Sequence, residues 1–109
     1  MFALVYRWKV RPGCESRFVE AWSELTEAIA AENGSLGSRL HLCEDGSYMA
    51  YAAWPSRERW DQSVLATERA RRCREIMTEC AERLLPDMRA ELVCDRLLPE
   101  GFGKHGTRG

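Results

Sequence analysis

The sequence predicts an α+β domain whose elements follow in the order β-α-β-β-α-β. Three observations carry this prediction. Two segments place apolar residues at the spacing of amphipathic helices. An alternating segment opens the chain, and a hairpin signal at Asp45-Gly46 lies between the two helical segments. This order places both helices on one face of a four-stranded antiparallel sheet.

The first strand and the first helix follow from their apolar periods. Residues 3–10 alternate in character, and Pro12-Gly13 stops the strand. The helix then runs to about residue 31 and ends in a left-handed cap at Asn33-Gly34. Its apolar stripe has offsets of 4, 7 and 11 and consists of Phe18, Trp22, Leu25 and Ile29.

Residues 37–54 predict the hairpin, closed by a two-residue turn because Asp-Gly favours type I′. In that register Leu40 and Leu42 share a face with Tyr51, and we assign this face to the helices. The other face carries the pairs Cys43–Tyr48, His41–Ala50 and Arg39–Ala52. The inverted assignment would bring His41, Arg39 and Trp54 to the helix side.

The remaining elements complete the domain over residues 1–98. Pro55 ends the hairpin, and Ser56 caps a short helix that carries Trp60 and Val64. A second long helix is expected from about residue 67 to 85, where Pro86 ends it, and the last strand covers 88–98. The apolar stripe of this second long helix repeats the spacing of the first and consists of Cys73, Met77, Cys80 and Leu84. Residues 99–109 are glycine-rich and predict a flexible tail.

Composition narrows the classes of partner. Sixteen basic and seventeen acidic residues give a net charge of −1, so no bulk field favours nucleic acid. No stretch approaches the roughly 20 apolar residues of a membrane span, and we expect a cytoplasmic protein with no membrane partner. The five cysteines are odd in number and include no Cys-x-x-Cys, which is typical of reduced thiols and not of a metal site.

Several motifs resemble a known family. They are Val10-Arg11-Pro12-Gly13 after the first strand, Gly34-Ser35-Leu36-Gly37 with Arg39-Leu40-His41 behind it, and Ala53-Trp54-Pro55-Ser56 after the hairpin. Together, over about residues 3–98, they resemble the antibiotic biosynthesis monooxygenase family. The resemblance implies a ferredoxin-like fold that forms a dimeric α+β barrel. A homodimer would also bury Val5, Val93 and Leu97, which we place on the sheet face away from the helices.

Members of that family include cofactor-free oxygenases of polycyclic phenols and haem-degrading enzymes. The resemblance places the Asn, Trp and His of the haem-degrading members near Tyr6, Ser63 and Cys73, and none of the three matches. We therefore do not expect haem degradation, and we interpret Cys73 as a packing residue.

A cofactor-free oxygenase needs a dry pocket, donors that stabilise an anionic substrate, and aromatic walls. We predict Tyr51, above all, and Tyr6 as the catalytic hydroxyls, with substrate-binding walls from Trp8, Trp22 and Trp60, although ordinary core packing is the commoner role for any single aromatic. His41 is the only imidazole before residue 99 and would act as the base in the inverted hairpin, beside Arg39 and Trp54.

The sequence thus favours a monooxygenase of a small aromatic or quinol-like substrate that uses no metal or other cofactor. The alternative is a ligand-binding or structural homodimer of the same fold without catalytic activity. No residue in the sequence separates the two.

Overall fold

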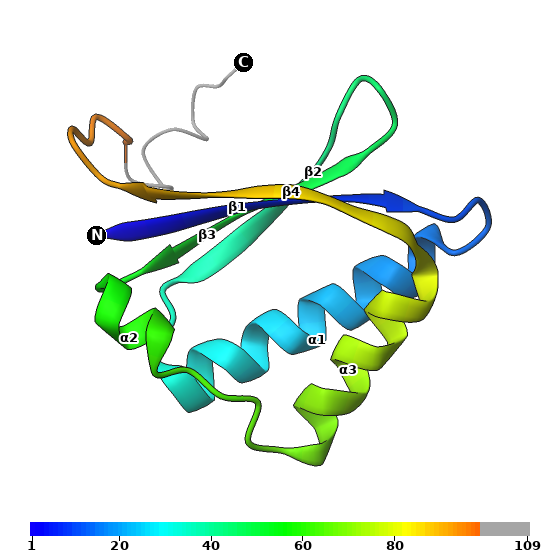
Figure 1. Ribbon diagram of the computed structural model, residues 1–109, viewed down its shortest axis with the longest axis horizontal. Coiled ribbons are helices and arrows are strands. Elements are labelled where there is room, and N and C mark those ends of the chain that lie inside the picture. The colour runs from blue at the N-terminus through cyan, green and yellow to red at the C-terminus, as the bar shows by residue number, and fades with distance from the viewer. Residues whose placement is uncertain (99–109) are drawn as a thin grey trace.

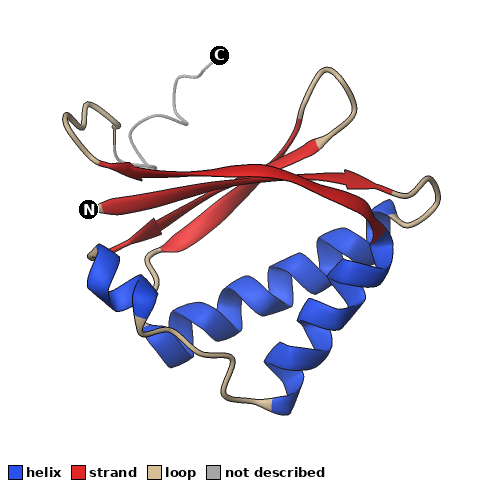
Figure 2. Cartoon of the chain, in the orientation of Figure 1, coloured by secondary structure: helices blue, strands red, loops and turns tan. Residues whose placement is uncertain are grey.

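The computed structural model describes residues 1–98, so the predicted tail at 99–109 lies outside the described residues. The elements are β1 (Phe2–Val10), α1 (Glu15–Asn33), β2 (Gly37–Leu42), β3 (Tyr48–Trp54), α2 (Arg57–Asp61), α3 (Glu68–Cys80) and β4 (Ala81–Glu91). The strands form one antiparallel sheet in the order β2-β3-β1-β4. Helices α1 and α3 lie beneath one face of this sheet, with α2 at one end (Figures 1 and 2). The predicted ferredoxin-like α+β fold is confirmed.

Helix α1 covers the sheet with the stripe that the sequence indicated. Phe18 and Leu25 are buried on it, together with Ala21 and Ala28. The helix ends at Gly34, whose φ of 77° is left-handed and whose N–H donates to the Ala30 carbonyl at 3.1 Å. The left-handed cap predicted at Asn33-Gly34 is therefore present, and glycine suits it because it carries no Cβ.

The hairpin loop contains three residues, not two. The N–H of Cys43 donates to the Ser47 carbonyl at 2.8 Å, so these residues close the loop, and Gly46 inside it has a φ of 88°. The Asp45 carboxylate accepts hydrogen bonds from the N–H and the hydroxyl of Ser47 at 2.9 and 2.7 Å. These bonds and the left-handed glycine suit a three-residue hairpin with a bulge. The predicted two-residue turn is wrong.

The extra loop residue turns over every side chain of β3 relative to the expected pairing. Leu40 pairs with Ala50, and Arg39 pairs with Tyr51. Leu40 packs toward the helices as expected. Tyr51 instead lies opposite Val5 of β1 on the other face of the sheet, where its side chain is 40% exposed. The prediction that Tyr51 faces the helices is wrong for this reason.

The junction between α3 and β4 also differs from the prediction. Helix α3 ends at Cys80 and the strand begins directly at Ala81, whereas the sequence predicted a helix to residue 85 and a strand from 88 to 98. Leu84 continues the helical spacing but lies in β4, opposite Trp8. A strand residue on the helix side of the sheet therefore fits the spacing expected for the next turn of the helix.

Pro86 marks a bulge inside β4 and not the end of a helix. Val5 pairs with Met88 and Arg7 pairs with Leu85, so Pro86 and Asp87 together face one residue of β1. Strand β4 is at the edge of the sheet. Edge strands and bulges are the places where a sheet tolerates the missing N–H of proline.

Helix α2 begins as predicted after Ser56, whose hydroxyl oxygen accepts a hydrogen bond from the Arg59 N–H at 3.1 Å. It ends at Asp61, so it carries Trp60, while Val64 lies in the segment that follows. No helix within residues 1–98 is both long and apolar enough to cross a membrane.

The buried residues form two clusters between the sheet and the helices. The larger joins α1, α3 and the end of β1, and it includes Cys73 and Cys80. Both thiols are free and buried, which confirms packing as the role expected for Cys73. The smaller cluster consists of Phe2, Leu4 and Trp54, with Trp60 of α2 packed against it.

We predict that Gly46→Ala lowers the free energy of unfolding by about 1–2 kcal/mol, because a Cβ is unfavourable at the left-handed φ of 88°. Urea unfolding would measure the change. Glu44→Ala, in the same loop and equally exposed to solvent, is the control and should leave the midpoint unchanged. Equal midpoints for both variants would contradict a requirement for glycine in this loop.

Candidate functional site

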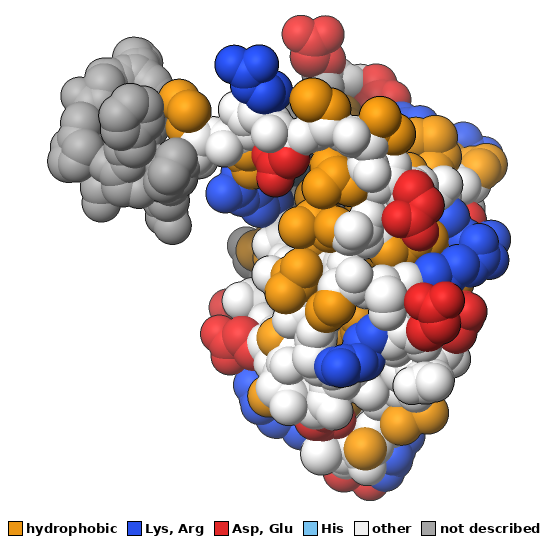
Figure 3. Space-filling view, turned by 90° about the vertical axis from the view of Figure 1, so that its left-hand side faces the viewer, with side chains coloured by type: hydrophobic (Ala, Val, Ile, Leu, Met, Phe, Trp, Pro, Cys, Tyr) orange, Lys and Arg blue, Asp and Glu red, His pale blue; other side chains and the backbone are white. Residues whose placement is uncertain are grey.

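A cavity of about 360 Å³ lies between the sheet and the helices α1 and α3. Its volume falls in the range of about 300–1,000 Å³ typical of small-molecule sites. Aromatic side chains from three elements supply much of the wall: Tyr6 and Trp8 of β1, Trp22 of α1 and Trp54 of β3. The end of the molecule that carries the N-terminus and α2 shows a band of hydrophobic side chains running from the sheet toward the helices (Figure 3).

The register of β3 opens this space. Ala50 and Ala52 point toward the helices and line the cavity. Their neighbours Met49 and Tyr51 point the other way, because successive side chains of a strand alternate between faces. In the two-residue turn predicted from the sequence, the larger pair would have occupied the helix side. Two methyl groups instead leave room for a ligand.

Tyr6 and Trp8 are held by ring contacts. Their rings stack with a centroid separation of 5.8 Å and an interplanar angle of 27°. Trp8 also meets Phe18 edge-on at 5.3 Å, and Phe18 contacts Tyr48 at 5.7 Å. Such contacts stabilise defined ring orientations. The aromatic wall therefore rests on the buried part of α1.

Burial raises the pKa of the Tyr6 hydroxyl above its ordinary value near 10. A hydrogen bond with the Trp60 side chain and the positive charges of Arg74 and Arg89 act in the opposite direction, but burial dominates. The phenol is consequently neutral near pH 7 and carries a proton that it can donate. Tyr6 is suited to hydrogen-bond a substrate oxygen and unsuited to act as a base.

Two of the residues that line the cavity carry ionisable side chains, Tyr6 and Arg74. The other polar side-chain groups are the hydroxyls of Thr26, Ser35, Ser38 and Thr78 and the indole N–H groups of the three tryptophans, and the lining includes no carboxylate, imidazole or thiol. Across residues 1–98, no three His, Cys, Asp or Glu side chains are grouped so that they could hold a metal ion. The charge of this site is therefore that of one guanidinium.

The other predicted residues lie elsewhere. His41 and Arg39 are exposed on β2 and alternate with Leu40, so they occupy the face of the sheet away from the helices, beside Tyr51. This is the arrangement that the preferred assignment gave for His41 and Arg39. It does not bring the imidazole to the cavity, and it separates Tyr51 from Tyr6 by the thickness of the sheet.

Trp54 lines the cavity and Trp60 does not, which is the reverse of the preferred expectation. Trp54 is 4% exposed and lines the cavity, although it was expected there only with His41 and Arg39 in the inverted hairpin. Trp60 lies beyond the lining, where its ring meets Phe2 at 5.5 Å and the Arg89 guanidinium lies 5.1 Å above it. Its link to the site is its effect on Tyr6, whose pKa the Trp60 side chain lowers.

Sequence reasoning missed Arg74, because it lies in a run of arginines that alternates with glutamates along its helix, a pattern typical of a solvated surface. The signal was its spacing, because Arg74 precedes Met77 by three positions and Thr78 by four, and all three line the cavity. Residues at those offsets share one side of a helix. Arg74 thus borders the apolar stripe. The hydroxyl of Thr78 donates a hydrogen bond to the backbone carbonyl of Arg74 at 3.0 Å.

The sequence model that describes antibiotic biosynthesis monooxygenases matches residues 1–75, well over half of the chain. The chain belongs to this family. The match spans β1 to the middle of α3 and so includes most of the residues that line the cavity. No protein among the curated ones matches the sequence.

Solved structures share the fold of this family member. A Chloroflexus aurantiacus protein classed with the antibiotic biosynthesis monooxygenases has a TM-score of 0.73 at 13% identity, covering 90% of this chain and 98% of its own. A Mycobacterium tuberculosis protein gives 0.70 at 18%, covering 88% and 98%. A variant of SnoaB, a cofactor-independent oxygenase from Streptomyces nogalater, gives 0.64 at 19%, covering 91% and 97%. At such identities these similarities establish the fold alone.

We predict that the alkaline titration of the native protein contains a phenol that ionises above pH 10 and is absent from Tyr6→Phe. Because the folded pKa is raised, its contribution to stability is fully present below about pH 10 and is lost as pH rises through the folded value. Ultraviolet difference absorbance would follow the phenolate. Tyr51→Phe, on the other face, should retain this component; its loss there would contradict the assignment to Tyr6.

Proposed function

We propose that this chain is a cofactor-independent monooxygenase of a small aromatic or quinol-like molecule, which binds in the cavity between the sheet and the helices. The observation that carries the proposal is the aromatic cavity of about 360 Å³ with a neutral phenol in its wall. Membership of the family supports the class of reaction. The similarity in fold to a cofactor-independent oxygenase agrees with it.

The substrate itself supplies the electrons in such a reaction. A ring carbon activated by a neighbouring hydroxyl or carbonyl loses a proton, and the resulting anion reduces O₂. A carbon–oxygen bond forms, the O–O bond then breaks, and the carbon that began as CH₂ becomes C=O. The second oxygen atom leaves as water with the two hydrogens of that carbon, so atoms and electrons balance without another reductant.

In this scheme the protein positions the substrate and stabilises its anion. The Tyr6 hydroxyl would donate a hydrogen bond to the oxygen on which negative charge develops. Trp8 and Trp22 would hold the ring, and the alanine pair at 50 and 52 would give it space. Tyr51 and His41 take no part in this proposal, because both lie on the other face of the sheet.

We also propose that two copies associate through the sheet face away from the helices. This face carries Tyr51 and Met88, which are 40% and 62% exposed, on either side of Val5. Leu85 and Met49 extend it along the neighbouring strands. Exposed apolar side chains that gather on one face of a sheet favour burial against a partner, and a second copy would bury the same patch twice.

A ligand-binding homodimer without catalytic activity is the second candidate. It is favoured by the lining of the cavity, which holds no carboxylate, imidazole or thiol that could remove a proton near neutral pH. Such a protein would bind aromatic molecules and leave O₂ unconsumed.

We predict that the chelator-treated protein consumes O₂ with members of a panel of anthrones, naphthols and hydroquinones. Tyr6→Phe should lower kcat/KM on the order of a hundredfold, because it removes a donor to the developing oxyanion. Tyr51→Phe is the matched control on the opposite face and should remain within about twofold. Binding without O₂ uptake would favour the second candidate, and equal effects of the two variants would remove Tyr6 from the mechanism.

We predict that the protein sediments at twice the mass of one chain and that Met88→Glu shifts it toward the monomer, because the new charge would be buried in the interface. Val64→Glu is the control, since Val64 is 63% exposed and lies beyond α2, away from the sheet face. Sedimentation equilibrium measures both. A wild-type protein at the mass of one chain would contradict the homodimer.

A further inference from the structure

The arginines of α3 divide into two kinds. Three of the four make ion pairs with carboxylates: Arg69 with Glu24 and Glu27 at 3.4 and 3.7 Å, Arg71 with Glu68 at 3.9 Å, and Arg72 with Glu75 at 3.3 Å. Arg74 makes no ion pair and its guanidinium makes no hydrogen bond with any residue of the 1–98 segment. The helix therefore keeps one cation without a partner.

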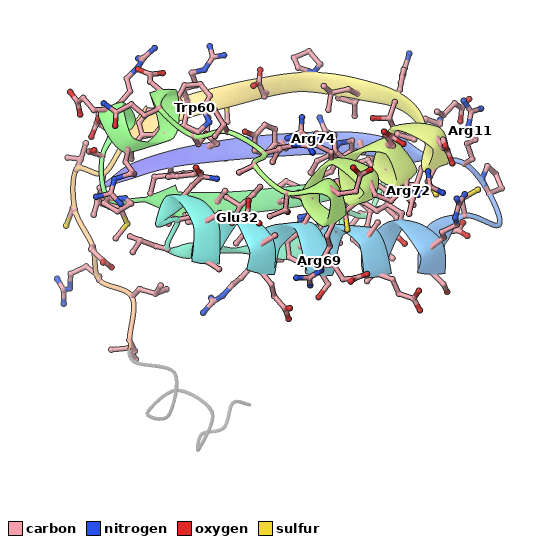
Figure 4. All side chains as sticks on the ribbon, turned by 90° about the horizontal axis from the view of Figure 1, so that it is seen from below. Arg11, Glu32, Trp60, Arg69, Arg72 and Arg74 are labelled. Atoms are coloured by element: carbon pink, nitrogen blue, oxygen red, sulfur yellow. The ribbon has the colours of Figure 1, made fainter. Side chains whose placement is uncertain are left out.

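That cation belongs to the cavity. Arg74 contributes to the lining, and its charge acts on the Tyr6 hydroxyl across the site. Viewed from the helix side, it lies over the sheet beside α3, whereas Arg69 lies toward α1 (Figure 4). The two arginines thus serve different sides of one helix: Arg69 joins α3 to α1, and Arg74 faces the space where a ligand would lie.

The charges of the cavity lining favour a ligand that carries a negative charge. Although the whole chain carries a net charge of −1, the lining of the cavity holds one positive side chain and no negative one. Arg74 is itself exposed, so its guanidinium lies where the cavity meets solvent, and the apolar and aromatic lining supplies no competing negative charge. A guanidinium also presents paired N–H groups that match the two oxygens of a carboxylate.

We propose that the molecule bound in this cavity is an aromatic acid, a hydroxylated ring whose carboxylate is held by Arg74. The inference rests on the proposed function and deepens it by naming the class of substrate. Tyr6 then takes the ring oxygen and Arg74 the carboxylate, so the two ionisable side chains of the lining contact different groups of one ligand. The carboxylate supplies the negative charge that the cavity itself lacks.

Isothermal titration calorimetry with a matched pair of probes tests this assignment. The probes are 1-hydroxy-2-naphthoate and 1-naphthol, which share a ring and a hydroxyl and differ by the carboxylate. We expect the full-length wild-type protein to bind the naphthoate about tenfold to a hundredfold more tightly. Arg74→Gln should remove this preference and leave the affinity for naphthol within about twofold. Arg71→Gln, on the same helix, is the matched control and should retain it.

Other outcomes overturn the proposal. Equal affinity of the wild type for both probes would do so, and so would failure of both to bind. Loss of both ligands in Arg74→Gln would assign Arg74 a structural role; in that case Arg74→Lys, which keeps the charge, must restore part of the preference or the proposal fails. O₂ uptake together with a preference for the naphthoate that Arg74→Gln leaves unchanged would overturn this inference and keep the oxygenase. Arg74-dependent binding of the acid without O₂ uptake would keep the inference and reject the oxygenase.

Discussion

The register of β3 is the constraint on which the rest of this structure depends. A strand alternates its side chains between two faces, so a shift of one residue exchanges the two sets completely. In this chain one set consists of Tyr48, Ala50, Ala52 and Trp54, and the other consists of Met49, Tyr51 and Ala53. The loop at residues 44–46 gives the set with the two central alanines to the helix side. The same loop gives Met49 and Tyr51 to the outer face, so one turn determines both the cavity and the apolar surface opposite it.

The helices are held over the sheet mainly by apolar packing. The ion pairs that link them, Arg17 with Glu79 and Arg69 with Glu24 and Glu27, are all more than half exposed. Pairs of this kind contribute little to stability. Their effect on the site is indirect, because the acidic side chains of α1 are directed to the outer surface and to Arg69. No carboxylate of α1 reaches the cavity lining.

The sequence predicted most of the fold and about half of the candidate site. Element order, the α1 stripe and the Gly34 cap follow from periodicity and turn chemistry, which are local properties. Trp22, Tyr6 and Trp8 were expected beside the cavity and line it. They belong to α1 and β1, and the alternation of apolar residues in these two elements was unambiguous. Tyr51 was misplaced, since its face depends on the length of a loop in which Asp-Gly suits either of two hairpin types.

Two further differences have longer-range causes. Leu84 fits the spacing of α3, and only its pairing with Trp8 shows that the chain has become a strand. Arg74 lies among arginines that look alike in sequence, and only the positions of the α1 carboxylates distinguish it from Arg69. In both cases the neighbour that determines the residue's environment is distant in the chain. A local sequence pattern contains no information about such a neighbour.

The bulge at Pro86 has a consequence for association between chains. Strand β4 is an edge of the sheet, and its exposed row of backbone groups would otherwise be a template for another β-strand. Proline has no N–H to donate to an added strand, and the bulge interrupts the regular spacing of β4. Growth of the sheet by addition of strands along this edge, the first step toward amyloid-like aggregates, is thereby disfavoured. Association through the outer face, as proposed above, would instead join two copies in a closed pair.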